Sequence, residues 1–127
     1  MDSQLAPLFV DTSARRLEQL VGRIGSCIER LSDDQVWARG SENENAIGNL
    51  MLHLAGNVRQ WILSGVGGKP DVRVRDREFS ARGNVTKSEM FERLSATPEM
   101  VIAAGIIAVA FAFGLWRYNQ RQGAAMV

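Results

Sequence analysis

Two long stretches of this chain repeat apolar residues at steps of three and four, which is the spacing of one face of an α-helix. The first helix is expected over residues 8–31, and the second runs from about 46 to 63, with Asn45 as its N-cap and Gly65 just after its end. Together the patterns predict an all-α fold. The two helices are expected to bury one shared apolar face, made of Leu20, Ile24, Ile28, Leu50, Leu54 and Trp61.

The first helix holds three small residues whose roles can be predicted. Gly22 and Gly25 predict close approach by a neighbouring helix, because a glycine inside a helix otherwise weakens it. Cys27 is the single cysteine, so it forms no internal disulfide, which fits a reducing compartment. We interpret it as a small core residue rather than a nucleophile, because no cationic residue is evident on its face of the helix.

Net charge excludes one class of partner. The 127 residues carry a formal charge of +1, and both signs are mixed along the chain. A nucleic-acid-binding protein would show a basic stripe or patch, so we expect no nucleic-acid partner. The first residues show no basic segment followed by an apolar one, so no secretory signal is evident and a cytoplasmic location is expected.

Two polar segments separate the predicted helices. Residues 32–45 are predicted to form a loop in which Trp37 packs over the core or lines the mouth of a cleft. Residues 69–85 are predicted to form an ordered surface loop. Its arginines have two interpretations: they contact an anionic ligand, or they pair with acidic neighbours in a solvated run. The arginines in question are Arg73, Arg75 and Arg77, and the acidic neighbours are Asp71, Asp76 and Glu78.

A third helix is predicted after residue 86. Thr86 and Glu89 form the capping-box pattern, in which the two side chains each bond to the other residue's backbone N–H. The helix that follows holds Met90, Phe91 and Leu94.

His53 is the only histidine, and it lies inside the apolar pattern of the second helix. With Asn57 and Gln60 it forms a polar line that should face inward or half inward, with Asn57 a candidate contact at a cleft. Burying an unpaired imidazole costs on the order of 1–3 kcal/mol, so a partner is expected: a hydroxyl, a carbonyl, a water or a metal ion. Spacing alone favours a hydrogen-bonded core histidine over a metal ligand.

The stretch from Phe9 to about Ala96 resembles the DinB/YfiT-like superfamily, in particular its DUF1572-type branch of uncharacterised proteins. That resemblance implies a four-helix bundle whose members commonly hold a divalent metal, such as zinc or nickel, with three histidines. Characterised relatives include thiol-dependent S-transferases and isomerases. By the resemblance, His53 matches the ligand on the second helix. The residues that carry the resemblance are Asn45–Gly68, Pro70-Asp71, Arg73–Phe79 and Arg82-Gly83.

The chain departs from the family pattern after Ala96. The two histidines expected on the last helix have no counterpart, and Glu99 is the only acidic residue that follows. One imidazole cannot make a catalytic zinc-type site, so we expect a degenerate site with no metal bound and no catalysis as a monomer. The alternative is a metal-dependent thiol S-transferase or isomerase whose site is completed by ligands from another chain.

An apolar C-terminal segment replaces the expected last helix. Thr97 and Pro98 predict a helix start, and residues 100–116 then carry no charge. These 17 residues are at the lower limit for a membrane span. The interpretations are a membrane-like anchor, a buried core helix or an altered terminus, and the apolar helices also allow a homo-oligomer. The predicted architecture is a partial DinB-like four-helix bundle over residues 1–96, followed by an aberrant apolar helix over 97–127.

Overall fold

The computed structural model describes residues 4–96, so the expectations for 97–127 lie outside the described residues. Every regular element in the described part is helical, which confirms the predicted all-α class. No helix within these residues is both long enough and apolar enough to cross a membrane. The elements are α1 (Leu5–Ile28), α2 (Asp33–Trp37), α3 (Ile47–Val58), the π-helical segment η1 (Arg59–Val66), α4 (Arg75–Ser80) and α5 (Lys87–Ser95).

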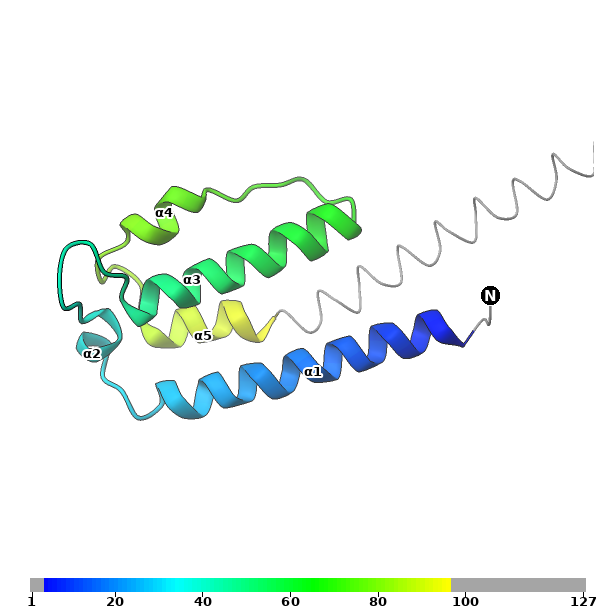
Figure 1. Ribbon diagram of the computed structural model, residues 1–127, viewed down its shortest axis with the longest axis horizontal. Coiled ribbons are helices and arrows are strands. Elements are labelled where there is room, and N and C mark those ends of the chain that lie inside the picture. Colours follow the sequence, from blue (N-terminus) through cyan, green and yellow to red (C-terminus); the bar gives the residue numbers. More distant parts are fainter. Residues whose placement is uncertain (1–3, 97–127) are drawn as a thin grey trace, which may run out of the picture.

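Helix α3 is the central element. It contacts α2, α4 and α5, and η1 continues from its C-terminal end, whereas α1 packs mainly on α5. Figure 1 shows α4 and the extended segment before it lying along the side of α3 that faces away from α1. Helix α4 therefore packs mainly on α3, and these two helices with the segment before α4 carry the functional residues described below.

The core lies where α1, α2, α3 and α5 meet. Met90 and Leu94 of α5 are each 1% exposed, which confirms that the capping box at Thr86 begins a helix that packs inward. The short helix α2 adds Val36 to the same cluster. The buried apolar cluster consists of Val21, Ile28, Val36, Met51, Met90 and Leu94.

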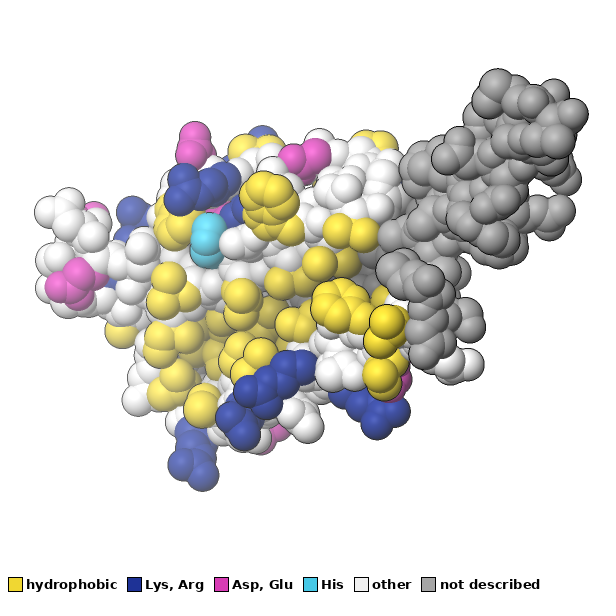
Figure 2. All heavy atoms as spheres, turned by 45° about the vertical axis from the view of Figure 1, so that its right-hand side comes forward, with side chains coloured by type: hydrophobic (Ala, Val, Ile, Leu, Met, Phe, Trp, Pro, Cys, Tyr) yellow, Lys and Arg dark blue, Asp and Glu magenta, His cyan; other side chains and the backbone are white. Residues whose placement is uncertain are grey.

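The predicted core on the second helix is wrong. Leu50, Leu54 and Trp61 are 53%, 41% and 66% exposed, and Leu20 of α1 is exposed as well. Of the predicted set, Ile28 is buried and Ile24 is partly buried against the core. Figure 2 shows apolar side chains gathered over one face of the molecule, next to the single histidine.

The physical reason is the rotation of α3 about its axis. The helix buries Gly48, Asn49 and Met51 instead of its most apolar stripe. A periodic stripe shows that a helix is amphipathic, but it does not say which neighbour covers the apolar side. In residues 4–96 the stripe of Leu50, Leu54 and Trp61 has an exposed side, which we call the open face.

One predicted helix contact on α1 is confirmed, and the prediction that Cys27 lies in the core is wrong. A Cβ atom on Gly25 would lie 2.7 Å from Cε2 of Phe91, so α5 does approach the backbone of α1 closely at this point. Among residues 4–96, nothing lies within 4 Å of the corresponding position on Gly22. Cys27 is exposed rather than in the core.

The polar segments contain two short helices that the apolar pattern did not predict. Helix α2 lies within 32–45 and begins with a capping box between Ser32 and Gln35, and α4 lies within 69–85. The N-cap of α3 is Ala46 rather than Asn45. Helices of five or six residues are too short to display a full apolar period, which explains why the pattern missed them.

The exposure difference between Leu54 and Leu94 can be tested by truncation. Leu94→Ala should lower the free energy of unfolding by about 2–5 kcal/mol, because it empties a filled core position. Leu54→Ala should lower it by less than about 1 kcal/mol, since much of this side chain already contacts water. Urea unfolding of the full chain, followed by circular dichroism, measures both. Equal losses would mean that the open face is covered in solution.

Candidate functional site: a histidine held by a buried ion pair

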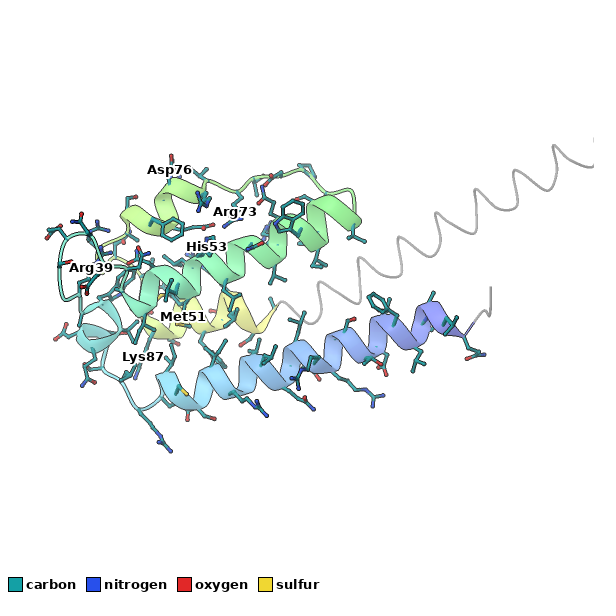
Figure 3. The ribbon with its side chains drawn as sticks, viewed as in Figure 1. Arg39, Met51, His53, Arg73, Asp76 and Lys87 are labelled. Carbon is teal, nitrogen blue, oxygen red and sulfur yellow. The ribbon has the colours of Figure 1, made fainter. Side chains whose placement is uncertain are left out.

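The single histidine contacts a buried ion pair. Arg73 Nε donates to Glu78 Oε1 over 2.7 Å, and Arg73 Nη2 donates to Oε2 over 2.8 Å, so the guanidinium binds the carboxylate through both oxygens. His53 Nδ1 lies 3.0 Å from Glu78 Oε2 and 2.9 Å from Arg73 Nη2. Figure 3 shows His53 on α3 and Arg73 on the segment before α4, with the two side chains pointing toward one another. The three side chains form one hydrogen-bonded cluster.

Gln60 of η1 and Asp71 hold the other edge of the Arg73 guanidinium and the Arg73 backbone in place. Arg73 Nη1 donates to Gln60 Oε1 over 2.8 Å, and Gln60 Nε2 in turn donates to Asp71 Oδ2 over 2.7 Å. The backbone N–H of Arg73 donates to Asp71 Oδ1 over 3.0 Å. A Cβ atom on Gly56 would lie 2.1 Å from Glu78 Oε1, so the glycine gives the carboxylate room against α3.

Charge pairing decides the protonation of the carboxyl group. Burial by itself pulls the pKa of Glu78 upward, but hydrogen bonds from Arg73 and His53 together outweigh burial, and the pKa is lowered. The hydrogen bond to Glu78 also raises the pKa of Arg73. Glu78 is therefore a carboxylate and Arg73 a cation at neutral pH.

His53 has two tautomers that fit this geometry. With the proton on Nδ1, the ring donates to the Glu78 carboxylate and Nε2 keeps a free lone pair. With the proton on Nε2, Nδ1 accepts a hydrogen bond from Arg73. Both of these hydrogen bonds have an ionised partner and are of the stronger, charge-assisted kind, and only the first tautomer leaves Nε2 with a lone pair that can bind. The ring of Phe79 packs on the imidazole with 4.9 Å between ring centroids, and 29% of the histidine side chain is exposed.

A fully buried amide ties α4 to α3 beside this cluster. Asn49 is 0% exposed, and its Nδ2 donates to the carbonyl oxygens of Glu78 over 2.8 Å and Ala81 over 3.2 Å. Its Oδ1 accepts the backbone N–H of Ala46 over 3.0 Å and a hydrogen bond from Arg39. Sequence reasoning missed Asn49, although it stands one helical turn before the histidine and extends the same polar line.

The three arginines predicted as anion contacts each make a different contact in the structure. Arg73 joins the histidine and pairs with an acidic neighbour, as the second of the two interpretations proposed, but this pair is buried rather than solvated. Arg75 lies over the ring of Phe79, with its guanidinium carbon 5.1 Å from the ring centroid. Arg77 lines a cavity that is described below.

The other two predicted contact residues lie apart from the ion pair. Trp37 packs against the core, and its Nε1 donates to the carbonyl oxygen of Val85 over 2.8 Å. Asn57 is half-buried on α3, one turn after His53. Neither contacts the imidazole by a hydrogen bond within residues 4–96.

Among residues 4–96, no group of three or more His, Cys, Asp or Glu side chains lies close enough to hold a metal ion. His53 is the only imidazole, and Glu78 contacts its Nδ1 while it is also bound to the guanidinium.

Comparison with known proteins places this site within one family. The family described as "Protein of unknown function (DUF1572)" matches residues 4–104, which is most of the chain. The chain belongs to the DUF1572 family. No curated protein and no solved structure matches it. The whole cluster of His53, Arg73 and Glu78 lies inside the segment that defines this DUF1572 protein as a family member.

The ion pair of Glu78 and Arg73 predicts how the free energy of unfolding changes at acid pH. Its folded pKa is lowered, whereas the unfolded value is about 4.3, so the unfolded chain binds more protons in this range. The stabilisation is complete above the unfolded pKa, and it should be lost as pH falls from about 5 through the folded pKa. Urea unfolding of the DUF1572 protein between about pH 6 and pH 3 measures this loss.

Glu78→Gln, which cannot titrate, should flatten that dependence on pH. It should not abolish it, because backbone hydrogen bonds lower the pKa of Asp71 and Glu89 as well. Glu92→Gln on the exposed side of α5 is the matched control and should keep the wild-type slope. An unchanged slope in Glu78→Gln would show that the carboxylate is not stabilised by Arg73 in solution.

Proposed function

We propose that this protein is a DinB-like bundle protein that keeps one ligand position of a metal centre, His53, and does not catalyse a reaction as a monomer. The observation that carries the proposal is the 3.0 Å contact between His53 Nδ1 and Glu78. Histidines that bind metals almost always donate their second ring N–H to a carboxylate, a carbonyl or a water. The contact of His53 with Glu78 is of this kind, and with the proton on Nδ1 it leaves Nε2 free to bind.

Residue count supports the second half of the proposal. Catalytic zinc sites use three protein ligands and keep one position open for water or substrate. The sequence has no second histidine, and the single cysteine is exposed on α1. We therefore assign no resident zinc or nickel to the monomer and no thiol-transfer step to its residues. The function that remains is binding, with the imidazole as a donor that needs further ligands.

One observation favours a second candidate function. The open face carries Leu50, Leu54 and Trp61 on α3 and η1, which is the stretch that also holds His53. Exposed apolar surface of this kind marks sites of protein association. A second chain on this face would bring its own side chains near Nε2, and the completed site would then act as a metal-dependent thiol S-transferase or isomerase.

Metal content separates the two candidates. The full chain is expressed with zinc and nickel in the medium, and monomer and oligomer fractions are separated before elemental analysis. We expect far less than one metal ion per chain in every fraction, unchanged by His53→Gln. Asn57→Ala, one turn further along α3, is the control for nonspecific effects. One metal ion per chain that is lost in His53→Gln and kept in Asn57→Ala would overturn the proposal and support the completed site.

A further inference from the structure

A cavity of about 760 Å³ lies between α3, α4, α5 and the segment before α4. Arg73 and Glu78 contribute to its wall, but His53 does not line it. Leu52 and Ala55 of α3, which do line it, stand on a different side of that helix from Leu54. The cavity is therefore separate from the open face as well as from the imidazole.

The charged side chains of the cavity are predominantly basic. Among the described residues, Arg59, Arg73, Arg77 and Arg93 line it together with two glutamates, which leaves an excess of two positive charges in this part of the lining. Arg73 is already bound to Glu78. The guanidinium groups of Arg59 and Arg77, by contrast, make no hydrogen bond or ion pair with any residue of the described chain. A concave surface of one charge sign concentrates ligands of the opposite sign.

The remainder of the cavity wall is mainly apolar. Cavities of about 300–1,000 Å³ with apolar walls and a few polar groups are typical of small-molecule sites. This cavity is within that range. The apolar wall is made of Leu52, Ala55, Val72, Val74 and Val85.

We propose that this cavity binds a small organic anion, with an aliphatic body of several carbons and one carboxylate or phosphate group. Arg59 and Arg77 bind the anionic group, because a guanidinium presents paired N–H donors that match two oxygens of such a group. The aliphatic body lies on the valines and on Leu52. The site stands apart from the function proposed for His53, since neither arginine hydrogen-bonds to the imidazole.

Calorimetric titration of the full chain tests this assignment with three probes of equal chain length: octanoate, octyl phosphate and 1-octanol. At least one of the two anions should bind saturably with one site per chain, and 1-octanol should bind at least about tenfold more weakly. The better anion identifies the preferred group. The double variant Arg59→Gln/Arg77→Gln should weaken anion binding by about tenfold or more and leave 1-octanol binding unchanged.

Arg23→Gln is the matched control, because Arg23 is an exposed arginine on α1 that pairs with no residue among 4–96 and does not line the cavity. It should bind the anions like the wild type. Arg59 and Arg77 are both exposed, so the double variant should keep the wild-type melting curve. If it does not, Arg77→Gln alone must show the weaker anion binding. No saturable binding of either anion, or equal anion affinity in wild type and variant, would overturn the proposal.

Discussion

The buried carboxylate of Glu78 is the group on which the candidate site depends. It joins α4 to α3, accepts two hydrogen bonds from one edge of the Arg73 guanidinium and contacts the only imidazole of the chain. Burial alone would raise the pKa of an isolated carboxyl group at this position, since burial disfavours the ionised form. The arginine keeps it ionised, and an ionised carboxylate is what can fix the proton of His53 on Nδ1. Removing Arg73 would therefore change the chemistry of the histidine as well as the packing of α4.

Helix α4 shows why polar contacts matter so much in a small bundle. With six residues it is far shorter than a helix that is stable by itself in water. Its attachment to α3 comes from the Glu78 cluster and from Asn49, whose amide donates to two backbone carbonyls at the end of α4. Buried polar groups that are fully paired specify one arrangement, because any other leaves them without partners. The same contacts that hold α4 therefore also orient the imidazole and form one wall of the arginine-lined cavity.

Local signals in the sequence predicted where helices form, but they did not predict which residues each helix packs against. The capping box at Thr86 and the close approach at Gly25 depend on a few adjacent residues or on one missing side chain, and both are confirmed. The exposure of Leu54 and the partner of His53 depend on how α3 is rotated and on a residue 25 positions away in sequence. Helical spacing carries no information about either. The partner of the imidazole is Glu78, which lies on a helix too short for the pattern to reveal.

The tautomer of His53 tests the central claim most directly, and a single histidine makes its signals unambiguous. Nitrogen-15 NMR of the full chain at about pH 9, where an ordinary imidazole is neutral, distinguishes a protonated ring nitrogen from one with a lone pair. If Glu78 orients the ring as described, Nδ1 carries the proton and Nε2 has the shift of an unprotonated nitrogen. A proton found mainly on Nε2 would mean that Arg73 donates to the ring, and that His53 is not held with Nε2 free to bind.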